Sequence, residues 1–199
     1  MIINAAELLP NIKLIVTEQM SGDLTEMLIA GRLDAAVLFN IESTSDFSAE
    51  PLVVERLCLI GAHDAPLVQE SSVESSMLTG QHLVGTYPPH GLRLLLENWS
   101  NENDLPLQFK IEADAPSVLI RLAASGHCYS IVSKAAINHE ILLGEIGAAE
   151  IVDPPIERTA CICTTKRLPP DDARNAIVAL VRTTVKEVVE NNQWPGATM

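Results

Sequence analysis

The stretch that follows the first ten residues constrains the fold most strongly, because an extended run, a helix and a second extended run succeed one another there. Ile12–Val16 is rich in β-branched side chains, which favour strands. Leu24, Met27 and Leu28 recur at helical spacing. Leu33–Phe39 is then almost continuously apolar, as in a strand that is buried on both faces. The pattern predicts a βαβ unit, and open α/β sheets bind ligands at the carboxyl ends of their strands.

The same alternation continues to the C-terminus. Further strands are predicted at Arg56–Ile60, His82–Thr86, Phe109–Glu112, Tyr129–Val132 and Arg158–Thr164. Helices are predicted at Glu70–Thr79, Leu92–Ser100, Pro116–Ser125 and after Pro169 and Pro170. Alternating strands and helices predict an α/β fold. The chain is predicted to cross between two subdomains near residues 80 and 158. The first subdomain then comprises residues 1–80 and 158–199, and the second comprises residues 81–157.

The composition limits the partners of the chain. A hydrophobic content of 47% provides for a sizeable core, and 26 acidic against 13 basic residues give a net charge of −13. Because this charge repels phosphate backbones, we expect that the chain by itself does not bind DNA. No apolar run is long enough to span a membrane, and the N-terminus lacks the positive start of a secretory signal. We therefore expect a cytoplasmic protein with no membrane partner.

An ordered set of motifs resembles a known family. The motifs are Glu18–Gly22, Gly31–Val37, Pro51–Leu57, Pro88–Arg93, Asp114–Ile131 and Val152–Arg158. Together they resemble the effector-binding domain of LysR-type bacterial transcriptional regulators over nearly all of the chain. The C-terminal Asn191–Gly196 is similar to the nitrogen-assimilation-control branch of that family.

The resemblance implies a fold like that of type 2 periplasmic binding proteins, with two Rossmann-like subdomains joined by a hinge. It implies a small-molecule effector in the cleft between them, and a homo-oligomer, with a dimer as the expected form. DNA would be contacted only through a winged helix-turn-helix, which this sequence does not contain. The family's first strand is also absent. We therefore expect unpaired edges on Ile12–Val16 and Leu33–Phe39, and either a dimer formed by exchange or low stability.

The first candidate effector-binding residues are Met20, Ser21 and Gly22, at the start of the first predicted helix. The Ser21 hydroxyl and the free backbone N–H groups beside it could hold an anionic or polar group of the effector. In the alternative interpretation Ser21 only caps the helix. The resemblance favours the functional interpretation, because effector contacts recur at this position in the family.

The other candidates lie in the predicted second subdomain. Thr86, Pro88, His90 and Gly91 join a strand to a helix, and Thr86 and His90 can supply hydrogen bonds, although His90 can instead cap the helix. Asp114, Ala115 and Pro116 precede the next helix, whose free N–H groups could also meet a ligand. The family often has Ser where this chain has Ala115, so these three residues are the weaker candidates.

The sequence contains no pattern that indicates an enzyme, a cofactor or a metal site. It has no Gly-x-Ser-x-Gly elbow, no phosphate-binding Gly-Lys loop and no zinc-spaced His pair, and its four cysteines form no Cys-x-x-Cys motif. Two alternatives to a regulatory domain stay open. One is a solute-binding protein, against which the missing signal sequence argues. The other is an enzyme on the same fold, such as a dehydratase or deaminase, which a strongly shifted acid or base in the cleft would favour.

Overall fold

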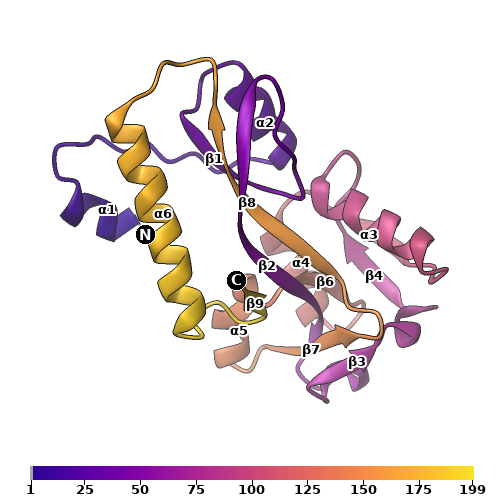
Figure 1. The fold of residues 1–199 in the computed structure, drawn as a ribbon. Helices are drawn as coiled ribbons and strands as arrows, with labels where there is room; N and C mark the ends of the chain where they lie inside the picture. Colours follow the sequence, from indigo (N-terminus) through magenta and orange to yellow (C-terminus); the bar gives the residue numbers. More distant parts are fainter. Residues whose placement is uncertain (1) are drawn as a thin grey trace. The chain divides into compact units, whose positions relative to one another are not determined.

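Figure 1 shows the computed structural model, which describes residues 2–199, with side chains from residue 5 onward. The chain divides into two compact units. Unit 1 comprises residues up to 54 together with 159–199, and unit 2 comprises 55–158. The first boundary therefore differs from the one predicted near residue 80. The reason is that Arg56–Ile60 belongs to a strand that continues into unit 2 and pairs there.

Unit 1 is a sheet with one helix on each face. The strands β1 (Ala35–Phe39) and β8 (Glu157–Thr165) pair antiparallel. On its other side β8 lies next to β2 (Phe47–Ala62) in the sheet. The helix α2 (Ser21–Ile29) covers one face of β1, and α6 (Asp172–Glu190) covers the other (Figure 1). The α2 face buries Leu28, Ala36, Leu38, Phe47, Cys161 and Cys163. The α6 face buries Leu52, Val53, Ala160, Ile162, Val178 and Val181. Alternate residues of each strand thus enter opposite cores, as the apolar run at 33–39 predicted.

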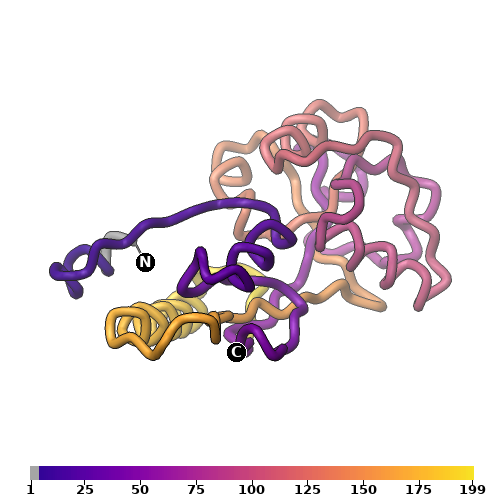
Figure 2. Tube along the Cα trace, turned by 90° about the horizontal axis from the view of Figure 1, so that it is seen from above, coloured from indigo at the N-terminus to yellow at the C-terminus, as the bar shows by residue number. Residues whose placement is uncertain are grey.

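The predicted strand Ile12–Val16 does not form. The chain runs from α1 (Ile2–Leu8) to α2 in an extended path, and Figure 2 shows this indigo trace passing beside α6. Ile15 and Val16 are 74% and 55% exposed. The β-branched residues favour an extended backbone, but a strand also needs a neighbour to pair with. No other part of residues 2–199 supplies one.

Unit 2 builds its sheet on the second half of β2. Strands β6 (Ser130–Ser133) and β7 (Ile146–Val152) both pair antiparallel with β2, and β3 (Ser72–Glu74) pairs parallel with β7. Strands β4 (His82–Gly85) and β5 (Gln108–Glu112) form a separate parallel pair. The remaining elements are the helices α3 (Gly91–Glu102), α4 (Pro116–Ala124) and α5 (Asn138–Leu142), the 3-10 turns η1 (Pro66–Val68), η2 (Ser75–Leu78) and η3 (Lys134–Ile137), and the short β9 (Ala197–Thr198), which pairs with β2 from unit 1. The helix predicted over Glu70–Thr79 is wrong, because β3 and η2 occupy that stretch.

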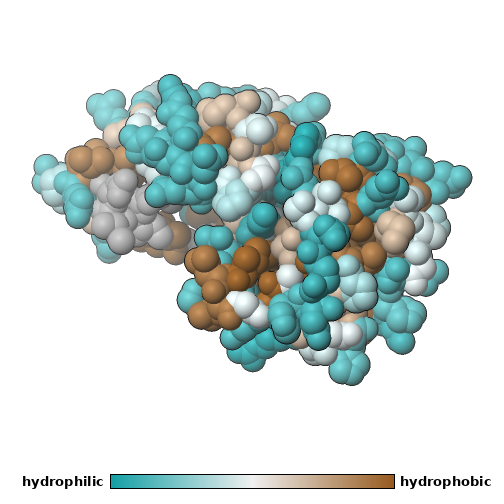
Figure 3. Space-filling model, turned by 90° about the horizontal axis from the view of Figure 1, so that it is seen from below, coloured by the Kyte–Doolittle hydropathy of each residue, from teal (hydrophilic) through white to brown (hydrophobic). Residues whose placement is uncertain are grey.

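The surface is mainly hydrophilic, with separate apolar patches. Figure 3 shows one face, on which brown apolar groups interrupt the teal polar surface. The end of α5 exposes two leucines, since Leu142 and Leu143 are 78% and 58% accessible to solvent. No helix among residues 2–199 is long and apolar enough to cross a membrane.

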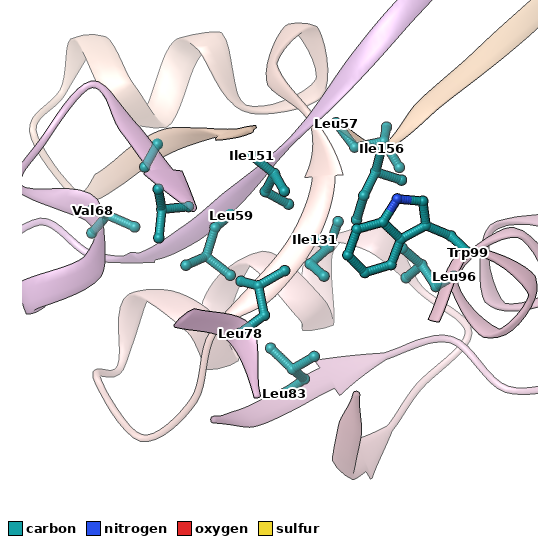
Figure 4. Packing of buried hydrophobic residues seen from close by; sticks show 12 residues of the cluster. Leu57, Leu59, Val68, Leu78, Leu83, Leu96, Trp99, Ile131, Ile151 and Ile156 are labelled. Atoms are coloured by element: carbon teal, nitrogen blue, oxygen red, sulfur yellow. The ribbon is translucent and has the colours of Figure 1, made fainter. Parts of the chain in front are cut away.

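The core of unit 2 is almost entirely aliphatic. Figure 4 shows Leu57, Leu59, Leu83, Ile131 and Ile151 meeting Leu96 and Trp99 of α3. The helix predicted at Leu92–Ser100 forms as α3, and its apolar face faces this core, because Leu96 and Trp99 are buried and Leu92 and Leu95 pack against the cluster. Trp99 also donates its indole N–H to the Pro155 carbonyl at 3.0 Å, so its polar edge is satisfied.

The four cysteines are buried and form no disulfide. Burial raises the pKa of the Cys58 thiol, and that of the Cys163 thiol, to about 12. These two thiols therefore stay protonated near neutral pH, and it is the thiolate that reacts with oxidants and electrophiles.

Leu59→Ala should destabilise unit 2 strongly, because Leu59 is fully buried in its core. Truncating a buried leucine costs ~2–5 kcal/mol through lost transfer energy and the cavity left behind. Leu142→Ala removes the same atoms from an exposed site and should change stability by less than ~0.5 kcal/mol. Urea unfolding followed by Trp99 fluorescence, with Trp194→Phe in every variant, measures both. Equal losses in the two variants would contradict the assigned core.

Candidate functional site

The carboxyl ends of β4 and β5 lie together in unit 2. Because the two strands are parallel, with Gly85 opposite Glu112, both end at the same edge. A hydrogen bond of 2.9 Å from the Ala113 amide to the Gly85 carbonyl fastens the two ends. Each strand leads by a short loop into a helix, β4 into α3 and β5 into α4. This edge therefore carries two helix N-termini, whose unpaired N–H groups and dipoles favour negatively charged or hydrogen-bond-accepting ligands.

Thr86 is the most distinctive residue of this edge. It follows β4 directly and is 3% exposed, yet its Oγ1 has no hydrogen-bond partner within the part of the chain that the structure describes. A buried hydroxyl without a partner costs ~1–3 kcal/mol. Such a group is uncommon in a folded protein, and a bound polar molecule would satisfy it.

Arg93 holds the Thr86 loop in place, although the sequence interpretation overlooked this role. Its guanidinium donates through Nη1 to the Thr86 carbonyl at 3.0 Å and to the Glu112 carboxylate at 2.6 Å, and through Nε to Glu97 at 2.6 Å. It also stacks 4.1 Å above the centre of the Phe109 ring. Four anchors from β4, α3 and β5 thus converge on one side chain that is 13% exposed. The i,i+4 spacing of Arg93 and Glu97 was the only sign of this in the sequence.

His90 is the N-cap of α3. Its Nδ1 accepts a hydrogen bond from the Leu92 amide at 3.1 Å, which agrees with the capping alternative considered from the sequence. Burial, and after it the positive charge of Arg158, lower the pKa of His90 below its ordinary value. His90 is therefore held neutral, since a protonated Nδ1 could not accept this hydrogen bond. Pro88 and Gly91 lie exposed on either side of His90, and Gly91 is the first residue of α3.

The start of α4 lacks a side-chain cap. Ala115 occupies the N-cap position with an extended backbone, Pro116 is the first helical residue, and Asp114 is exposed. No side chain accepts from the first-turn amides of α4. Asp114 therefore does not serve as the cap. Pro116 has no N–H, and the Val118 amide donates to the Ala115 carbonyl at 2.9 Å, so Ser117 supplies the first-turn amide that remains available to a ligand or to solvent.

The remaining candidates belong to unit 1, at the start of α2. Met20 is the N-cap and Ser21 the first helical residue, but no side chain caps this helix. The alternative interpretation, in which Ser21 only caps the helix, is therefore wrong. The half-buried Ser21 instead offers its carbonyl to the Thr25 hydroxyl at 2.7 Å. Gly22 is exposed and borders open space, so its lack of a side chain is not required by packing.

No group of three or more His, Cys, Asp or Glu side chains within residues 2–199 is arranged to hold a metal ion.

The chain is similar to known regulators. The family model of the LysR substrate binding domain matches residues 4–186. The HTH-type transcriptional regulator BbuR of Bordetella bronchiseptica is 26% identical over 187 residues, which is 94% of this chain and 58% of that protein. The chain thus spans about half the length of the curated relatives it matches.

Solved structures of similar fold agree. The CcmR regulatory domain of Synechocystis PCC6803, in complex with 2-PG, gives a TM-score of 0.83 at 15% identity, covering 93% of this chain and 89% of that chain. The effector-binding domain of QuiR, in complex with shikimate, gives a TM-score of 0.80 at 16% identity, covering 94% and 88%. These neighbours bear out the expected α/β fold of the type 2 periplasmic-binding-protein kind. The chain belongs to the LysR substrate-binding domain family.

Proposed function

We propose that this chain is the effector-sensing domain of a LysR-type transcriptional regulator, and that it binds a small carboxylate or similarly polar molecule beside Thr86. The observation that supports this most directly is the buried, unpartnered Thr86 hydroxyl at the carboxyl ends of two parallel strands. Open α/β sheets bind ligands at such ends.

The chemistry of the edge favours an effector that accepts hydrogen bonds. The Thr86 hydroxyl and the Ser117 amide of α4 are donors, while the amide of Leu92 in α3 is already satisfied by His90. Arg93 pairs with Glu112 and also with Glu97, so these three groups together carry one net negative charge. The exposed Asp114 opposes a strongly charged anion, so we favour a small monocarboxylate, a class to which the QuiR ligand shikimate belongs. In this proposal Met20, Ser21 and Gly22 supply the contacts from unit 1.

In the proposed mechanism, effector binding changes the relative populations of different arrangements of the two units. The effector stabilises whichever arrangement of the two units it binds more tightly. In a full regulator this arrangement would alter how paired winged helix-turn-helix domains meet DNA. The chain would contribute the effector site and part of a homodimer contact, in the cytoplasm.

An enzymatic function is less well supported. Proton-transfer chemistry needs a titratable group that is free to exchange its proton near neutral pH. At this edge the pKa of His90 is shifted, but its Nδ1 is committed to the cap of α3. A solute-binding protein would use the same edge, and it differs from a regulatory domain in having no DNA-binding partner domain.

Thr86→Val should weaken effector binding without loss of stability. A thermal-shift screen of small acids, amino acids and nitrogen metabolites identifies a ligand, and calorimetry then measures its affinity. Valine keeps the shape of threonine and removes the hydroxyl, so a hydrogen bond worth ~1.5–3 kcal/mol to a charged ligand is lost. That corresponds to about 10- to 150-fold weaker binding.

The free protein should keep or gain stability in Thr86→Val, because the hydroxyl has no partner to lose. Thr79→Val, on an exposed residue of unit 2 outside this edge, is the matched control and should leave affinity unchanged. Unaltered affinity in Thr86→Val would remove Thr86 from the site.

His90→Asn should reduce the loss of stability on acidification. Because the pKa of His90 is lowered in the folded state, the unfolded chain takes up the proton first, and stability falls as the pH drops through ~6.5. Asn remains an effective N-cap but does not titrate. Chemical unfolding between pH 8 and pH 5 measures the difference, with the exposed His63→Asn as control. Parallel curves for His90→Asn and the wild type would show that His90 does not cause the pH dependence.

This chain alone should not bind DNA specifically. Its net charge of −13 repels the phosphate backbone, whereas binding to DNA gains its affinity from basic residues that release counterions. An electrophoretic mobility shift titration at low salt, where electrostatic attraction is strongest, is the most permissive test. Tight, sequence-dependent binding at low salt would contradict the proposal that this chain senses the effector and that a winged helix-turn-helix domain contacts DNA.

A further inference from the structure

The last residue of β4, Gly85, lies directly against the side chain of Phe109 in β5. A Cβ atom at Gly85 would come 2.5 Å from the nearest ring atom, so any other residue there would displace the ring. The two strands pair side by side, which brings the ring next to the end of β4. The residue after Gly85 is Thr86, whose hydroxyl has no partner in the described structure. The place of the Phe109 ring is therefore set by the same backbone that carries Thr86.

The guanidinium of Arg93 closes this set of contacts. It stacks 4.1 Å from the centre of the Phe109 ring, and its Nη1 donates to the Thr86 carbonyl at 3.0 Å. The contacts thus run from Gly85 through Phe109 and Arg93 back to the next residue of the chain. A planar guanidinium that both stacks on a ring and donates to fixed acceptors has one orientation, whereas lysine offers neither the plane nor the fork of donors.

Arg93 is poorly suited to bind an anionic effector by itself. Its Nε and Nη1 already donate to Glu97, Glu112 and the Thr86 carbonyl, and its side chain is 13% exposed. Because two carboxylates accompany one guanidinium, a further carboxylate that approaches Arg93 meets a net negative charge. Arg93 therefore acts on a bound anion through the Thr86 backbone and not by direct contact.

We propose that Arg93 is a positioning residue, which sets the affinity for the effector by fixing the Thr86 hydroxyl, and that the Phe109 ring supports it in this role. The inference rests on the function proposed above, in which the Thr86 hydroxyl contacts a small monocarboxylate. A hydroxyl without a partner in the protein is placed only by its own backbone and rotamer. Since hydrogen bonds weaken steeply with distance and angle, a displaced Thr86 backbone lowers the affinity directly.

The first measurement needs no effector. The His90 amide donates to the Tyr87 carbonyl at 3.0 Å, so its hydrogen exchange, followed by NMR, reports how firmly the loop after Thr86 is held. Arg93→Lys and Phe109→Leu should each speed this exchange at least about fivefold, since residues in contact couple by about 1 kcal/mol. The amides in the middle of α3 should exchange at the wild-type rate, which shows that the helix stays folded.

The second measurement is calorimetry with shikimate, a small monocarboxylate, as the probe. Arg93→Lys should weaken binding at least about fivefold although lysine keeps the positive charge. Arg121→Lys, exposed in the last turn of α4, is the matched control and should leave the affinity unchanged. A double variant with Thr86→Val and Arg93→Lys should bind within about twofold of Thr86→Val alone, because valine has no hydroxyl left to position.

The outcomes separate this proposal from the proposed function. The proposal is overturned if Arg93→Lys leaves the His90 exchange unaltered, or if it leaves shikimate binding intact while Thr86→Val weakens it. It is also overturned if the two single losses add in the double variant, because Arg93 would then act independently of Thr86. If Thr86→Val itself binds as tightly as the wild type, or if the wild type binds no small monocarboxylate, the proposed function fails instead.

Discussion

The structure depends on the pairing of one long strand. β2 spans 16 residues, and it contributes its first part to the sheet of unit 1 and its second part to the sheet of unit 2. In unit 2 both of its edges are used, since Cys58 lies opposite Val132 of β6 and Glu150 of β7. A strand with partners on both sides and cores on both faces leaves no backbone group unsatisfied. The cores of both units are assembled on this strand.

A buried ion pair marks the place where the chain passes between the units. Glu55 is 1% exposed and accepts hydrogen bonds from Arg158 at 2.5 Å and from the Ser133 hydroxyl at 2.7 Å. Removing one member of such a pair is expected to cost more than the pair contributes, because the remaining charge stays buried. The arrangement fixes β2 against the returning β8 at the two residues where unit 2 begins and ends.

This thorough pairing is incomplete at two side chains of the described structure. At the carboxyl ends of β4 and β5, Arg93 donates to the Thr86 carbonyl, Glu97 and Glu112, whereas the Thr86 hydroxyl has no partner in the described structure. At the beginning of α6, the Nη1 of Arg174 is shielded from solvent without a hydrogen-bond partner in the described structure, while its Nη2 donates to the Pro169 carbonyl. Elsewhere buried polar groups of the described side chains are satisfied, which makes the exceptions informative.

The sequence by itself determined the elements whose causes are local. The apolar spacing of α3 placed Leu96 and Trp99 in a core, and the acidic residues after Pro170 placed the N-terminus of α6, where Asp171 accepts from two amides. The ordered motifs also identified the family, and with it the fold. The tertiary structure alone decided whether extended residues became strands. Ile12–Val16 has the composition of a strand but no partner in the described chain, while β2 extends beyond both ends of the predicted strand Arg56–Ile60 because partners are available on both sides. Strand pairing joins residues that are far apart in the chain, so local patterns cannot reveal it, and the same holds for the unpartnered hydroxyl of Thr86.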